Sequence, residues 1–132
     1  MNPRPSAPDL LQAVSEFIRD EATPTLDGAA AFHARVAMNV LEIVRREMHL
    51  GAAADADERA RLQRLLHAAE EDLQRLNTDL CQRISLGDFG LHTPGLVDHL
   101  WRTTLARLAI DQPSYSTFLR HRASTGAKPG EQ

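Results

Sequence analysis

Apolar side chains recur along this chain in steps of three and four residues, the spacing that places residues on one face of an α-helix. The most regular run follows Asp57 and forms a stripe about 100° wide on a helical wheel. No strand-like alternation of apolar and polar residues competes with this spacing. The pattern therefore predicts an all-α protein. The members of the regular run are Leu62, Leu65, Ala69, Leu73, Leu76, Leu80 and Ile84.

Capping residues and helix breakers divide the pattern into four main helices. Gly51 is a plausible C-terminal cap of the second helix, and the small, acidic segment after it is expected to be a loop. Thr93-Pro94 offers an N-cap hydroxyl and a proline for the first turn of the fourth helix. The third helix should be the longest, and a short helical turn around Tyr115 to Leu119 should fold back onto the bundle. The expected helices cover about 8–23, 27–51, 57–86 and 94–110.

The four helices favour a single-domain bundle over residues 8–122, because a chain of 132 residues can enclose one hydrophobic core. Residues 1–7 hold two prolines among mostly small or polar residues, and residues 123–132 hold no large apolar side chain. Both ends are therefore expected to be mobile.

The segment from Phe32 to Leu50 is unusual because two polar residues, His33 and Glu47, fall inside its apolar arc. They are fourteen residues apart. A helix that rises about 1.5 Å per residue separates them by about 21 Å, so they cannot share one site. A histidine in a first helical turn is usually a capping or partly buried residue, which leaves Glu47 as the sharper candidate.

A carboxylate in a dry core needs a partner, because burying an unpaired charge costs several kcal/mol. His99, Trp101 and Arg102 of the fourth helix could complete a ligand-binding or acid–base site with Glu47. Two simpler interpretations stay open. Glu47 could form a structural ion pair, or it could reach solvent from the last turn before Gly51.

Arg35, Asn39 and Arg46 lie along the border of the same apolar arc. Arginine and asparagine side chains in a row can hold a phosphate, a carboxylate or the backbone of another protein. These three residues are therefore candidates for docking a partner. They could equally hydrogen-bond to loops of the same chain, since charges of both signs are common on helix flanks.

The charge distribution argues against a nucleic-acid partner. The net charge is −3, and the basic residues alternate with acidic ones instead of forming a basic stripe. The sequence contains no run of eighteen apolar residues, so no membrane contact is expected. The N-terminus also lacks the apolar run of a secretory signal. We therefore expect a cytoplasmic protein. Abundant Ala and the use of Arg over Lys indicate GC-rich coding and a bacterial source.

Motifs that carry catalysis or bind cofactors do not occur. The six histidines are dispersed and none belongs to a Glu-x-x-His pair, so no metal ligands are assigned. The single cysteine, Cys81, is expected to be a buried, inert thiol. No glycine-rich phosphate loop is present. We assign no catalytic residue and no cofactor, and an intrinsic enzyme activity has little support.

Three segments together resemble one known family: ARVAMNVLEIVRRE, LNTDLCQRISLGDF and LWRTTLARLAIDQPSYSTF. It is an uncharacterised bacterial family of all-helical domains. Its members stand beside, or fused to the C-terminus of, aminoglycoside-phosphotransferase-like kinases, often near acyl-CoA dehydrogenases. The resemblance spans about residues 8 to 119. It implies association with a kinase-like enzyme and supplies no catalytic residue.

The leading hypothesis is a non-catalytic accessory module for protein–protein interaction, which partners a phosphotransferase-like kinase or forms a homo-oligomer. Either the row of Arg35, Asn39 and Arg46 or an exposed apolar strip would make the contact. The alternative is a small-ligand or acid–base site at the seam between the second and fourth helices, around Glu47.

Overall fold

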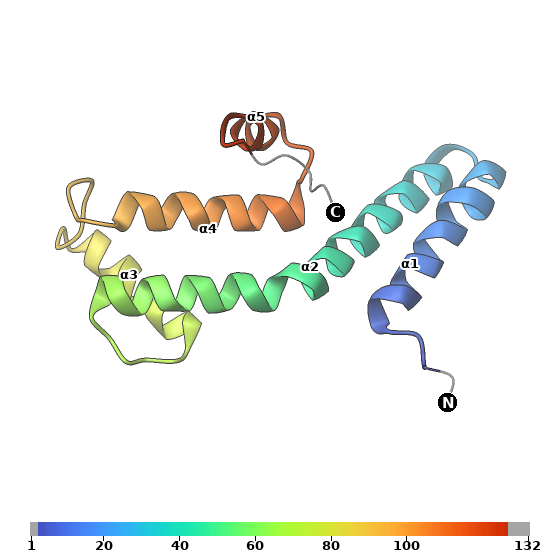
Figure 1. Ribbon diagram of the computed structural model, residues 1–132. Helices are drawn as coiled ribbons and strands as arrows, with labels where there is room; N and C mark the ends of the chain where they lie inside the picture. Colours follow the sequence, from blue (N-terminus) through green and yellow to red (C-terminus); the bar gives the residue numbers. More distant parts are fainter. Residues whose placement is uncertain (1–2, 127–132) are drawn as a thin grey trace. The chain divides into compact units, whose positions relative to one another are not determined.

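The computed structural model describes residues 3–126, which form helices and connecting turns with no strand (Figure 1). The all-α class expected from the apolar spacing is thereby confirmed. Internal contacts divide the chain into two compact units, residues 1–51 and 52–132, and α2 contributes to both. The elements are α1 (Ala7–Phe17), η1 (Ile18–Ala22), η2 (Thr23–Thr25), α2 (Gly28–Leu66), α3 (Leu73–Ser85), α4 (Leu96–Asp111) and α5 (Ser116–Ser124).

The long helix α2 corrects two expectations from the sequence. It continues through Gly51 for a total of 39 residues, so the expected loop after Gly51 is helical, and α2 is the longest helix. Alanine-rich sequence favours the helix there, and a glycine inside a helix costs only about 1 kcal/mol. The break falls instead after Leu66, where His67 adopts a left-handed φ of 51°. The expected third helix is therefore divided between α2 and α3.

The first unit is a helical hairpin of α1 and the N-terminal part of α2 (Figure 1). A capping box starts α1 close to the expected position, because the Ser6 and Asp9 side chains each accept a hydrogen bond from the other's backbone N–H. Between the helices the chain passes through a π-helical turn and a 3-10 turn. The last of these turns ends at Thr25, close to residue 23, where the sequence predicts the end of the first helix.

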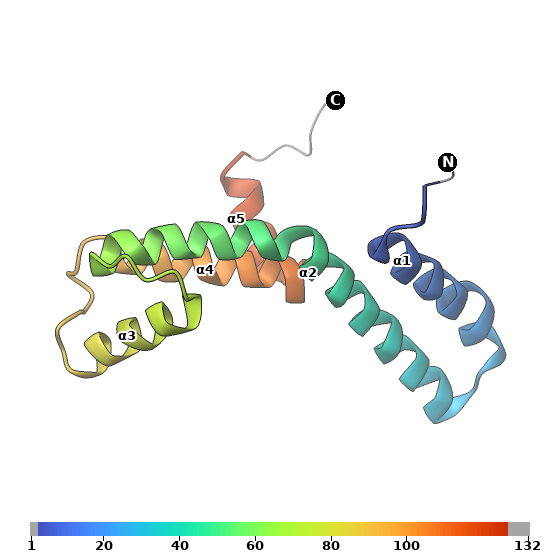
Figure 2. The same ribbon diagram turned by 90° about the horizontal axis from the view of Figure 1, so that it is seen from below.

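The second unit contains a hydrophobic core of leucines. The end of α2, α3 and the start of α4 contribute to it; Figure 1 shows α4 above this part of α2, and Figure 2, turned by 90°, shows α3 below it. Burying each leucine contributes about 1.5–3 kcal/mol to stability. Three of the five buried leucines belong to the apolar stripe seen in the sequence. The five are Leu62, Leu66, Leu76, Leu80 and Leu96.

The start of α4 differs from the expected N-cap. The Thr93 hydroxyl accepts a hydrogen bond from the Gly90 N–H (2.9 Å) and does not cap the helix. Instead the N-cap is Gly95, which has a left-handed φ of 86° and no side chain to bond the first-turn amides. Further along, α5 folds back on α4 as expected, and the Trp101 and His121 rings meet edge to face at 5.3 Å.

Two further expectations concern the ends of the chain and membranes. The expected mobile segments at residues 1–7 and 123–132 lie partly outside the described residues, which exclude 1–2 and 127–132. Within residues 3–126, α1 begins at Ala7 and α5 extends to Ser124. No helix in this range has the length and apolar character needed to cross a membrane.

Candidate functional site

An apolar row follows the N-terminal part of α2 and remains exposed on the hairpin of the first unit. Its members recur every four residues, so they fall along one slowly turning line on the helix. Between 41% and 57% of the surface of each residue is exposed. We call these residues the α2 row: Phe32, Val36, Val40, Val44 and Met48.

The facing helix does not cover this apolar surface. Leu10, Val14 and Phe17 of α1 are themselves 48–56% exposed. Among the described residues of the first unit, only Ser15 and Gly51 are buried. The hairpin therefore has no fully buried apolar side chain among its described residues, and many of its large apolar side chains are exposed.

A polar contact holds the two helices of the hairpin together. Buried Ser15 of α1 donates its hydroxyl to the Glu42 carboxylate (3.1 Å), and Arg45 donates to the other carboxylate oxygen (2.9 Å). The hydrogen bond from Arg45 is the main cause that lowers the pKa of Glu42, with a smaller contribution from Ser15, while partial burial opposes them. Glu42 therefore stays ionised and links α1 to α2.

The three residues expected to dock a partner flank this contact on α2. Arg35 and Asn39 are exposed, whereas Arg46 is half-buried. Glu42 lies between them on the same border of the helix and is engaged with α1. Of the three predicted docking residues, Arg35 and Asn39 are thus the two whose side chains are exposed.

Glu47 does not lie in a core. The side chain is exposed, as is that of His33, so neither polar residue of the apolar arc is buried. Both residues fall on the apolar side of the helical wheel, but the hairpin leaves that side exposed. Glu47 belongs to the first unit, whereas His99, Trp101 and Arg102 belong to the second.

In the second unit, a buried arginine ties α2 to α4. Arg61 is only 7% exposed and lies next to His99, which is 2% exposed. The Arg61 Nε–H donates to Nδ1 of His99 (3.4 Å), one Nη donates to Asp57, and the other donates to the Thr103 hydroxyl (3.1 Å). The guanidinium is therefore satisfied from both helices, as a buried charge must be.

The environment of His99 favours the neutral imidazole. Burial is the first cause that lowers the pKa of His99, and the positive charge of Arg61 is the second. Glu58 and Asp98 act in the opposite direction but more weakly. Because Nδ1 accepts the Arg61 hydrogen bond, the neutral ring carries its proton on Nε2.

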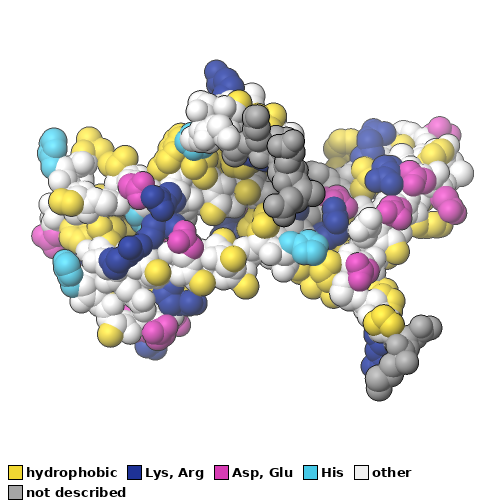
Figure 3. Space-filling view, in the orientation of Figure 1, with side chains coloured by type: hydrophobic (Ala, Val, Ile, Leu, Met, Phe, Trp, Pro, Cys, Tyr) yellow, Lys and Arg dark blue, Asp and Glu magenta, His cyan; other side chains and the backbone are white. Residues whose placement is uncertain are grey.

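A cavity of about 330 Å³ opens beside this pair, between the end of α2 and the start of α4. Arg61 and Arg64 from α2, together with Asp98, His99 and Arg102 from α4, contribute to its lining. Figure 3 shows Arg side chains gathered over the facing ends of these two helices, with acidic side chains at the edge. The cavity thus holds more positive than negative groups.

Two of the predicted ligand-binding residues, His99 and Arg102, share this cavity. Trp101 does not line it, because its ring contacts His121 of α5 on another side of α4. Arg61 and Arg64 are not predicted from the sequence as site residues, because they resemble ordinary members of a mixed-charge segment. One signal was available for Arg61: it lies one turn before Leu65 and next to Leu62, at the edge of the apolar stripe.

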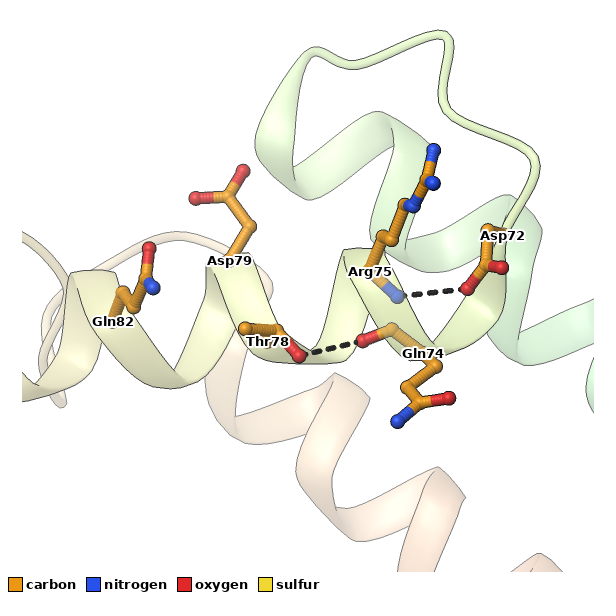
Figure 4. Close-up of a pocket in the computed structure, with 6 residues that line it drawn as sticks. All are labelled: Asp72, Gln74, Arg75, Thr78, Asp79 and Gln82. Carbon is orange, nitrogen blue, oxygen red and sulfur yellow. Dashed lines mark hydrogen bonds between the residues drawn. The ribbon is translucent and has the colours of Figure 1, made fainter.

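A second hollow lies on α3 and has a different character. Figure 4 shows its lining side chains spaced along one helix, with two local hydrogen bonds: Arg75 N–H to Asp72, and the Thr78 hydroxyl to the Gln74 carbonyl. Asp79, also on this surface, is paired with Arg83 at 3.0 Å. These groups do not converge from different elements, so we do not treat the surface as a site.

Two observations bear on reactive groups. Cys81 is exposed on α3, which corrects the expectation of a buried thiol; it falls on the polar flank of the leucine stripe, where no other element covers it. Across residues 3–126, no three His, Cys, Asp or Glu residues are grouped so that they could hold a metal ion.

A family model described as "Domain of unknown function (DUF6285)" matches residues 24–115. No curated protein and no solved structure matches the chain. The matched range covers α2, α3 and α4 entirely, and it therefore includes both the α2 row and the arginine-lined cavity.

Proposed function

The chain belongs to the DUF6285 domain family, and from this premise we propose that it is a non-catalytic helical module that binds another protein through the α2 row. A phosphotransferase-like kinase is the partner we propose, as the resemblance of the sequence implies. Binding would take place in the bacterial cytoplasm.

The observation that carries this proposal is the exposure of the α2 row. Five large apolar residues in line, each more than 40% exposed, form an apolar surface that a partner helix could cover. An apolar row at helical spacing is the surface that a helix-in-groove or helix-on-helix contact requires. Arg35 and Asn39 at its border could supply polar contacts at the rim of such an interface.

The test is a binding measurement with the purified chain and a purified phosphotransferase-like kinase from the same organism, using Val40→Glu to place a charge in the middle of the α2 row. We expect this variant to weaken the complex about tenfold or more, because a central, desolvated charge opposes binding. Leu91→Glu is the matched control. It also replaces an apolar side chain by glutamate, at a residue that is 85% exposed but outside the α2 row, and it should leave binding unchanged.

Two other outcomes are informative. If the chain associates with itself and Val40→Glu abolishes that association while the kinase-like protein does not bind, the row is an interface between copies and the kinase partner is wrong. If the chain binds neither the kinase-like protein nor a second copy of itself, the α2 row is not the interaction surface. The same conclusion follows if Val40→Glu and Leu91→Glu weaken binding equally.

A further inference from the structure

Among the arginines that line the cavity between α2 and α4, Arg64 is the one without an acidic partner in the described part of the chain. Asp57 pairs with Arg61, and Asp98 pairs with Nε of Arg102 at 3.0 Å. Arg64 donates its Nε–H to the Ala60 carbonyl (3.3 Å) of its own helix and has no carboxylate partner among the described residues. Its positive charge is therefore not neutralised within residues 3–126.

The free hydrogen-bond donors come from both sides of the cavity. The Nη groups of Arg64 on α2 and of Arg102 on α4 have no hydrogen-bond partner in the described part of the chain. Each guanidinium can present a two-donor fork to an oxyanion. The start of α4, which also lines the cavity at Gly95, lacks a side-chain cap and adds a smaller positive potential.

We propose that this cavity binds the phosphate group of a small phosphorylated compound, held between Arg64 and Arg102. A carboxylate has two oxygens, and a single guanidinium can donate to both of them. The three terminal oxygens of a phosphate monoester can accept from both forks at once. A cavity of about 330 Å³ also leaves space for an organic group beside the phosphate.

His99 and Arg61 position this site without binding the phosphate. The hydrogen bonds from Arg61 to His99 and to Thr103 fix the end of α2 against α4, so that Arg64 and Arg102 face one cavity. Asp98 is the acidic residue in the lining, and its carboxylate is engaged by Arg102. All residues that line the cavity belong to the second unit, whereas the α2 row belongs to the first. The ligand of this site therefore does not depend on the proposed protein partner.

The experiment follows backbone amide NMR signals of the full chain during titration with glycerol phosphate, inorganic phosphate and acetate. We expect saturable shifts at the start of α4 and the end of α2, with a dissociation constant of about 1 mM or tighter for glycerol phosphate. Arg64→Gln and Arg102→Gln should each weaken binding about tenfold. Arg120→Gln on α5 is the control and should bind normally.

Each alternative result overturns the assignment in a defined way. Equal or tighter binding of acetate would identify a carboxylate site. Binding of inorganic phosphate alone would exclude a ligand with an organic group. The absence of saturable shifts, or equal losses in Arg64→Gln and Arg120→Gln, would show that the cavity does not bind anions. Arg64 has no carboxylate partner within residues 3–126, so its variant should fold, and its amide spectrum verifies this.

Discussion

Single residues carry the polar contacts that connect the helices within each unit. In the first unit, one carboxylate, Glu42, accepts from Ser15 of α1 and from Arg45 of its own helix. In the second, one guanidinium, Arg61, donates to groups on α2 and α4. Both charged groups are at least partly withdrawn from water, which makes each dependent on its partners.

The buried imidazole of His99 should make stability depend on pH near neutrality. The folded protein lowers its pKa from the ordinary value of 6.5, so the unfolded chain binds a proton more readily. The stabilising contribution is therefore complete above about pH 6.5 and is lost as the pH falls from there toward the folded pKa. Urea unfolding between about pH 7.5 and 5.5 measures this decline.

His99→Asn is the control for this pH dependence. The asparagine side chain offers an acceptor to Arg61 Nε at about the place of Nδ1, but it does not titrate. The variant should therefore lose most of the decline in unfolding free energy over this pH range. An undiminished decline in His99→Asn would assign the effect to other groups.

At the scale of whole elements, the continuity of α2 is the largest departure from the sequence pattern. Gly51 was a reasonable cap, since glycine commonly ends helices, but a cap needs a left-handed residue and Gly51 is helical. The left-handed conformation occurs at His67 instead, with φ 51°. Asp72, whose carboxylate accepts from the Arg75 N–H, then starts α3.

Gly51→Ala should stabilise the protein, because glycine inside a helix costs about 0.5–1 kcal/mol relative to alanine. The added methyl group would meet the Glu47 carboxylate at 3.0 Å, which is the end of an exposed, flexible side chain and can move. Gly87→Ala makes the same chemical change at a left-handed residue with φ 80°. It should destabilise by about 1 kcal/mol.

Thermal or urea unfolding of both variants measures this contrast. A destabilised Gly51→Ala would mean that the absence of a side chain at Gly51 matters for packing and not only for helix propensity. A neutral Gly87→Ala would mean that the turn after α3 can adopt another conformation.

At the scale of the whole molecule, the two units differ in how much apolar surface they bury. The leucine core lies in the second unit, whereas the described part of the first unit buries Ser15 and Gly51 alone. Isolated helices without a buried face are marginal in water. The first unit should therefore be the less stable part when it is separated from the rest of the chain.

Two fragments test this difference. Residues 52–126 should unfold cooperatively in urea, whereas residues 3–51 should have low helix content and no cooperative transition, as followed by circular dichroism. The split falls where internal contacts divide the chain. A cooperatively folded fragment of residues 3–51 would contradict this prediction and would show that the hairpin is stabilised without a hydrophobic core.

The sequence by itself determined the helical class and most of the apolar faces. Helical periodicity depends on residues three and four positions apart, so Leu62, Leu76 and Leu80 could be placed on one face without knowing what covers it. The starts of α1 and α2 also lie close to the positions expected from the sequence. These properties need only short-range information.

Only the tertiary structure decided which polar residues are buried between helices and which are exposed. Glu47 lies inside an apolar arc and Arg61 lies at the edge of an apolar stripe, yet Glu47 is exposed and Arg61 is buried. The difference arises because α4 covers the face of α2 that carries Arg61, while the hairpin leaves the arc of Glu47 open. Whether a face is covered depends on elements far apart in the chain, and no local pattern encodes that.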